Sequence, residues 1–177
     1  MGSTPNVDSG GVESGDLQVR ILPPHLKKGK EMKVVINKCF GGFSLSMAGD
    51  EKYLNLIGKK AYFYKQTKHE FKDGVEEYKK IKPNEENAGM FTYCFTKDLG
   101  EIIDKKTLNE NYEKYHFYNN DLDRSDETLI KVVELLGDDA NGSCAKLSIV
   151  EIPDDISYEI EEYDGNEHIA ERHNTWS

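Results

Sequence analysis

The stretch that decides the fold reads Leu129-Ile-Lys-Val-Val-Glu-Leu-Leu-Gly137, then Ala145-Lys-Leu-Ser-Ile-Val-Glu-Ile-Pro153, then Tyr158-Glu-Ile-Glu-Glu-Tyr-Asp-Gly165. Its first block repeats apolar residues at helical spacing, with Leu129, Val133 and Leu136 on one face and Asp126 placed to cap the helix. The next two blocks are short runs bounded by turn residues, which is typical of strands. This stretch therefore predicts a helix, two strands and a final helix over 165–173.

The rest of the chain supplies more strands than helices. The elements expected upstream are a strand at 33–36, a helix capped by Ser44 or Ser46, strands on both sides of Asp73-Gly74, and a strand at 91–95. Residues 100–123 show no firm periodicity and are expected to be mainly irregular. The order of elements predicts an α/β (α+β) protein, with a mixed sheet of about five to six strands and two to three helices packed mainly on one side.

The domain organisation follows from length and composition. The chain has 177 residues, which fits one domain. Residues 1–31 are dominated by Gly, Ser, Pro and Asp, so we expect a flexible leader and a single globular domain over 32–177. Codons for 27–32 can form a purine-rich stretch that ends in a start codon. We hypothesise that Met32 is the natural start and the leader is non-native or untranslated in the natural gene; the alternative is a functional arm.

Composition predicts a soluble and polar cytoplasmic protein. Hydrophobic residues make up 37% and charged residues 32% of the chain, and the formal net charge is −10. No apolar run approaches the roughly 18 residues that a membrane helix needs, and the N-terminus lacks a signal-peptide pattern. The cysteines Cys39, Cys94 and Cys144 are odd in number and far apart, which favours reduced thiols.

The C-terminal region carries a dense group of carboxylates. Between Glu151 and Glu171 there are nine acidic residues and no Lys or Arg. The candidate partner-binding face is formed by Glu159, Glu161, Glu162 and Asp164. Two other interpretations are an ordinary solvated face and a general acid/base set. The latter would consist of Glu161, Glu162, Asp164 and Glu167, and it needs separations that a sequence cannot show.

Basic residues are concentrated in the middle of the chain. Between Lys59 and Lys82 there are eight lysines and four acidic residues. Lysines interleaved with aromatic residues are suited to contact nucleic acid, since lysines meet phosphates and aromatic rings stack on bases. The candidate contacts are Lys59, Lys60, Lys65, Lys68 and Lys72. Aromatic residues that simply fill a sheet core would give the same pattern.

A glycine-containing loop follows the first strand, at the position where small α/β proteins often bind ligands. The candidate ligand-binding residues are Asn37, Gly41, Gly42, Phe43 and the distant Arg124. The alternative is a tight turn in which the glycines supply backbone freedom, with Arg124 paired to a carboxylate of the C-terminal segment. Cys39 would need a base that the sequence does not indicate before it could act as a nucleophile.

Metal binding is not expected. His168 and His173 are five residues apart, which does not align two imidazoles on one helical face. The sequence contains no phosphate-binding loop and no pattern typical of a nucleophile. We therefore assign no catalytic residue, no metal ligand and no cofactor.

Residues 33–46 and 145–176 together resemble a family of small proteins encoded by phages and mobile elements of gut Firmicutes. The resemblance covers most of 32–176 and is loose over 59–121, which implies a variable middle region. Some members of this family resemble type II-A anti-CRISPR proteins. No functional residue of the family can be transferred to a position of this chain.

The resemblance implies a phage anti-defence protein that inhibits the RNA-guided DNA nuclease of type II CRISPR systems by direct binding, without catalysis. Its partners would be the nuclease complex of the host, with DNA or guide RNA as a further contact, in the bacterial cytoplasm and away from membranes. One alternative is a sponge that sequesters a nucleotide second messenger of an antiphage system. Another is a small enzyme that acts on nucleotides.

Overall fold

The computed structural model describes residues 30–70, 75–83 and 92–172, with only the backbone at 68–70 and 75. Within these residues it has eight strands in three sheets and three α-helices, so the α+β class is confirmed, with more strands than expected. The elements are β1 (Glu31–Asn37), α1 (Met47–Leu56), β2 (Tyr62–Glu70), β3 (Val75–Ile81), β4 (Thr92–Phe95), β5 (Ile102–Asp104), α2 (Lys105–Tyr115), η1 (Asn119–Asp121), α3 (Glu127–Leu136), η2 (Gly137–Ala140), β6 (Leu147–Pro153), β7 (Tyr158–Tyr163) and β8 (Asn166–Glu171).

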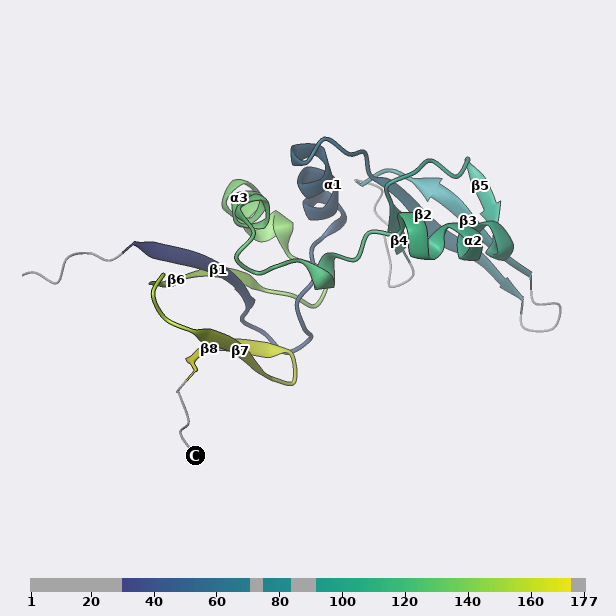
Figure 1. The fold of residues 1–177 in the computed structure, drawn as a ribbon. Coiled ribbons are helices and arrows are strands. Elements are labelled where there is room, and N and C mark those ends of the chain that lie inside the picture. The colour runs from purple at the N-terminus through teal and green to yellow at the C-terminus, as the bar shows by residue number, and fades with distance from the viewer. Residues whose placement is uncertain (1–29, 71–74, 84–91, 173–177) are drawn as a thin grey trace, which may run out of the picture.

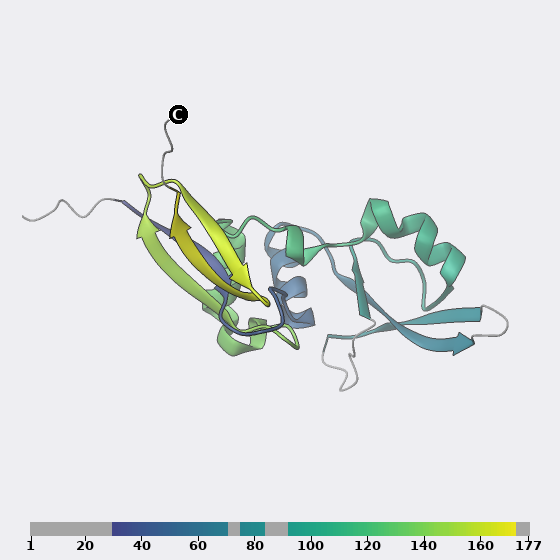
Figure 2. The same ribbon diagram turned by 90° about the horizontal axis from the view of Figure 1, so that it is seen from below.

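The antiparallel ribbon β1–β6 forms the middle layer of one half of the molecule. Val34 pairs with Val150 and Val35 pairs with Ile149, so alternate residues point to opposite faces. Val35 and Ile149 pack in the core that contains α1 and α3. Val34 and Val150 belong to a second core together with residues of β7 and β8. Helices therefore cover one face of the ribbon and the β7–β8 hairpin covers the other (Figures 1 and 2).

Both helices of this half begin at the predicted caps. Ser46 Oγ accepts a hydrogen bond from the Gly49 amide at 3.0 Å, and the Asp126 carboxylate accepts from two backbone amides at the start of α3. Gly137 ends α3 with a positive φ of 55°. These local signals predicted the helix boundaries because caps satisfy amides that have no partner inside the helix.

The segment between α1 and α3 forms the other half, a sheet of order β4-β2-β3-β5 with α2 packed against it (Figure 1). The predicted strands on both sides of Asp73-Gly74 are confirmed as β2 and β3, and the turn itself lies outside the described residues. The prediction that 100–123 is irregular is wrong, since this range contains β5, α2 and η1. Leu108 is the only fully buried residue of α2, so the helix leaves little apolar periodicity in the sequence.

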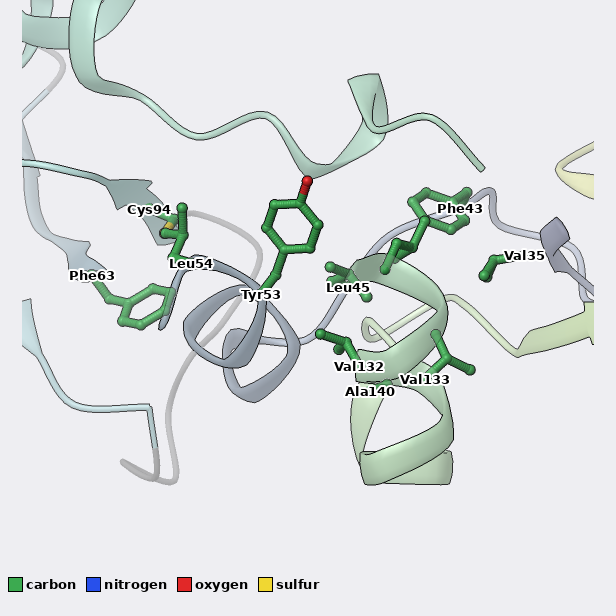
Figure 3. Close-up of a cluster of buried hydrophobic side chains, with 11 residues drawn as sticks. Val35, Phe43, Leu45, Tyr53, Leu54, Phe63, Cys94, Val132, Val133 and Ala140 are labelled. Atoms are coloured by element: carbon green, nitrogen blue, oxygen red, sulfur yellow. The ribbon is translucent and has the colours of Figure 1, made fainter. Parts of the chain in front are cut away.

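One core joins the two halves. Tyr53 and Leu54 of α1 pack in the same cluster as Phe63 of β2 and Cys94 of β4 (Figure 3). Phe63 and Leu54 are 2% and 1% exposed, so this contact excludes water. Among the described residues, no helix is both long enough and apolar enough to cross a membrane.

The predicted helix over 165–173 is wrong where the structure describes it. Residues 166–171 form β8, antiparallel to β7, and His173 lies beyond the described residues. Asp164 and Gly165 have φ of 51° and 83°, as a two-residue hairpin turn of type I′ requires. Strand β1 begins at Glu31, the last residue of the expected leader, which pairs with Pro153 in the β1–β6 ribbon.

Candidate functional site

The hairpin β7–β8 has an apolar face and a polar face. Ile160 and Ile169 are paired across the two strands and pack toward β1–β6. Glu159, Glu161 and Tyr163 alternate with the inward residues and therefore share the outward face. Glu159 and Glu161, two of the four predicted partner-binding carboxylates, are thus brought together on an exposed surface.

The other two predicted carboxylates occupy different positions. Glu162 follows the inward alternation and pairs with Glu167, and its carboxylate accepts a hydrogen bond from the Gly165 amide at 3.0 Å. Asp164 lies in the turn at the tip of the hairpin. All four carboxylate residues are exposed, but they are spread from Glu159, opposite Ala170, to the turn at Asp164 and do not share one face.

Two basic side chains lie among these carboxylates. His168 Nε2 is 3.0 Å from a carboxylate oxygen of Glu161, and the Arg172 guanidinium is 3.4 Å from Glu159. All four side chains are 45% exposed or more, so water screens both pairs and each contributes little to stability. The outward face therefore keeps carboxylates available to a partner that competes with these weak contacts.

A buried ion pair fixes the hairpin to the rest of the protein. Arg124 lies 3.2 Å from Glu167, and their side chains are 17% and 9% exposed. A second oxygen of Glu167 accepts the backbone N–H of Asn37 at 2.7 Å, and the Arg124 guanidinium stacks 3.3 Å from the Phe43 ring centre. Burial lowers the pKa of Arg124, and Glu167 opposes that shift. The sequence predicted a partner for Arg124 in the C-terminal segment, and the structure identifies it as Glu167.

The candidate ligand loop is filled by the protein itself. The Asn37 side-chain amide donates to the carbonyls of Cys39 and Gly165, and its oxygen accepts from the Lys146 amide. A Cβ on Gly165 would overlap the backbone nitrogen of Gly42, so the hairpin turn sits directly on this loop.

Backbone freedom explains the two glycines of this loop. Gly41 and Gly42 have φ of 141° and 88°, which favours glycine. The structure thus brings all five predicted ligand-loop residues into one region, but most of their contacts are with the β7–β8 turn, Glu167 and the segment that contains Cys144 and Lys146. The tight-turn interpretation accounts for these glycines.

The predicted basic contacts that the structure describes are exposed or partly buried, but two aromatic residues beside them in the sequence are buried. Lys59 and Lys60 are exposed after α1, and Lys65 is partly buried on β2. Only the backbone of Lys68 is described, and Lys72 lies outside the described residues. Phe63 and Tyr64 are 2% and 0% exposed, so their rings fill the sheet core, as the alternative interpretation held.

Cysteines and potential metal ligands are further reactive groups among the described residues. The three cysteines are free, and burial raises the pKa of the Cys94 thiol. Across residues 30–70, 75–83 and 92–172 no three His, Cys, Asp or Glu side chains are grouped to hold a metal ion.

Sequence reasoning missed an exposed aromatic residue, Tyr163, at the candidate site. Tyr163 is 78% exposed on the outward face of the hairpin, beside the candidate carboxylates. Its place in the alternation with Glu159 and Glu161 was visible in the sequence as period two. Its exposure was not, because the residues that cover a strand come from elsewhere in the chain.

Comparisons of this chain with protein-family models, with curated proteins and with solved structures gave no match. The resemblance to phage-encoded proteins therefore stays a hypothesis.

Proposed function

We propose that this protein is an anti-defence protein of a phage or mobile element, and that it inhibits a type II RNA-guided DNA nuclease by direct binding in the bacterial host cytoplasm. The observation that carries the proposal is the acidic surface along the β7–β8 hairpin. Glu159 and Glu161 lie on its outward face, Asp164 at its tip and Glu162 beside the turn.

The chemistry of the partner fits this surface. RNA-guided nucleases hold nucleic acid in positively charged channels and read the flanking DNA motif with arginine side chains. Carboxylates spaced along a strand can occupy such a channel in place of phosphates. Complementary charge also accelerates the encounter of the two proteins and makes it dependent on salt.

Rigidity of the hairpin supports the same proposal. The buried pair Arg124–Glu167 and the hydrogen bond from Asn37 hold the hairpin against β1. A surface that is already ordered loses less conformational freedom on binding, so more of the interaction energy remains as affinity.

The test is inhibition of DNA cleavage by a panel of type II nuclease–guide complexes. The variant E159Q/E161Q/E162Q/D164N removes four negative charges while keeping the hydrogen-bonding groups. The control E110Q/E113Q/D121N/E127Q removes the same charge from exposed residues elsewhere. We expect the hairpin variant to inhibit clearly less than the wild type at low salt and the control to inhibit normally, with little change in Tm for either.

Two results would contradict the proposal. One is equal inhibition by the hairpin variant and the wild type at low salt. The other is that the wild type neither inhibits nor binds any nuclease complex of the panel. If such a protein showed a rise in Tm with a nucleotide, the second-messenger sponge would take its place, since a ligand stabilises the state that it binds.

A further inference from the structure

Two aromatic side chains stand out from the surface at the tip of the hairpin. Tyr163 is 78% exposed and Phe40 is 66% exposed, the two highest values among the large hydrophobic residues that the structure describes. Single exposed apolar residues are common on soluble proteins. Two exposed aromatic residues from distant parts of the chain, each next to the same backbone contact, are more informative.

The two residues flank the same contact. The Gly41 amide donates a hydrogen bond to the Asp164 carbonyl at 3.3 Å. Phe40 precedes Gly41 and Tyr163 precedes Asp164, so both rings project from backbone that this contact joins. The backbone here is closely packed, because a Cβ on Gly165 would overlap Gly42 and one on Gly41 would overlap the Cys144 carbonyl. The backbone that carries the two rings is therefore held in place by close packing.

Carboxylates border this aromatic pair. Glu161, Glu162 and Asp164 are exposed around the hairpin tip, whereas two exposed lysines, Lys38 and Lys146, lie on the Phe40 side. Exposed aromatic residues surrounded by a charged rim are typical of protein interfaces, in which Tyr and Phe enter pockets and the rim sets specificity. Nucleic acid fits poorly, because its phosphates would meet the carboxylates.

A second copy of this chain also fits poorly. In a two-fold contact the same patch faces itself, which would place the carboxylates of one tip against those of the other. A protein with an apolar cleft edged by Arg or Lys could bury the two aromatic rings and pair with the surrounding carboxylates.

We infer that Phe40 and Tyr163 form the aromatic anchor of a protein-binding surface whose partner presents an apolar cleft edged by Arg or Lys. The inference rests on the proposed function in one respect, which is that the nuclease is taken as the partner that binds the tip of this hairpin. It adds a loop residue, Phe40, that lies far from the hairpin in the sequence. It also predicts that the partner surface is amphipathic and not only basic.

The first experiment measures binding of F40A, Y163A and F40A/Y163A to the nuclease complex that the wild type inhibits. The controls are I102A and L135A, which remove apolar side chains that are 61% and 56% exposed at other places. We expect each anchor variant to bind at least about tenfold more weakly, as for interface hot spots, and each control to bind as the wild type does. Normal binding by the double variant would refute the anchor while leaving the proposed function intact.

A second experiment separates the inference from the nuclease. The probe is a fluorescein-labelled amphipathic helical peptide of about 20 residues, with Leu on one face and Arg on the other. The control peptide has the same pattern with Glu in place of Arg. Fluorescence anisotropy should show that the wild type binds the Leu/Arg peptide in preference, and that F40A/Y163A binds it several-fold more weakly. The inference fails if the wild type binds neither peptide, if the double variant binds like the wild type, or if light scattering shows a wild-type dimer that the double variant loses.

Discussion

Gly165 approaches Gly42 so closely that a side chain at position 165 would overlap the backbone nitrogen of residue 42. Both residues also have positive φ, 83° at Gly165 and 88° at Gly42. The contact places the turn of β7–β8 on the loop that follows β1. The orientation of the acidic hairpin therefore depends on the absence of a side chain at one position.

The variant G165A should be destabilised both by the positive φ at position 165 and by overlap of its Cβ with Gly42. Its positive φ costs about 1–2 kcal/mol for an L-residue, and the overlap with Gly42 adds to that cost. The control is G58A, which has a φ of 74° and nothing within 4 Å of its added Cβ. Urea unfolding should give a clearly larger loss of stability for G165A than for G58A. Equal losses would show that the close approach of the two loops is unimportant.

Removal of the Glu167 carboxylate should be among the most damaging single changes in the hairpin. Glu167 accepts hydrogen bonds from the Asn37 backbone N–H and from Arg124, so E167A leaves a partly buried cation and a buried backbone N–H without their partner. Breaking a buried ion pair from one side costs about 3–5 kcal/mol. Replacement of the exposed Glu159 by Ala should change the free energy of unfolding by no more than about 0.5 kcal/mol.

A double-mutant cycle tests whether the cost comes from the pair. The variants are R124A, E167A and R124A/E167A, measured by urea unfolding. We expect the double variant to lose less than the sum of the two single losses, because neither charge is then left alone. Strict additivity would mean that Arg124 and Glu167 act independently.

The helix caps show what local sequence could predict. Ser46 and Asp126 bond to amides within three residues of themselves, so the chain around them carries the whole signal. The distribution of eight strands among three sheets could not be predicted, because β1 pairs with β6 from the far end of the chain. No periodicity identifies which strand will be a neighbour.

The errors at the C-terminus have a physical origin. Asp164-Gly165 is typical of a hairpin turn, but the spacing of Ile169, Arg172 and Trp176 favoured a helix in the prediction. The pairing of Ile160 with Ile169 over the apolar face of β1–β6 decided in favour of a strand. For the candidate site, the alternation of β7 separates Glu162 from Glu159 and Glu161, which strand period two could have predicted.

His116 provides a test of burial without a hydrogen bond. Its Nδ1 is buried and has no hydrogen-bond partner among the residues that the structure describes, and its ring stacks on Tyr112 at 4.4 Å between centres. Burial lowers the pKa of His116 from 6.5 to about 4. The unfolded chain therefore binds the proton more readily, so the protein loses stability as the pH falls from 6.5 toward 4.

The variant H116F should keep the ring stack and remove the unpartnered nitrogen. We expect a higher Tm than the wild type at neutral pH and a larger advantage near pH 4, where the wild type must hold the imidazole neutral. Thermal unfolding at both pH values measures this difference. A lower Tm for H116F throughout would indicate that the imidazole has a polar partner that the Phe ring cannot replace.

Asp50 should have the opposite pH dependence. Its side chain is buried in α1, with 7% of the residue exposed, and it accepts a hydrogen bond from Asn119 Nδ2 at 2.8 Å. Burial raises the pKa of Asp50 from 3.8 to about 7, and the bond from Asn119 only partly opposes this. Between these two values the folded protein holds a proton that the unfolded chain releases.

The free energy of unfolding should therefore fall by up to about 4 kcal/mol as the pH rises from 3.8 to 7, at 1.36 kcal/mol per pKa unit. The variant D50N keeps an oxygen for Asn119 and cannot ionise. It should be clearly more stable than the wild type at about pH 8 and equally stable below about pH 4. Because other carboxylates also titrate, the quantity to measure is the difference between variant and wild type, with D155N at an exposed turn as the control. A D50N advantage that does not change with pH would show that burial of Asp50 carries no such cost.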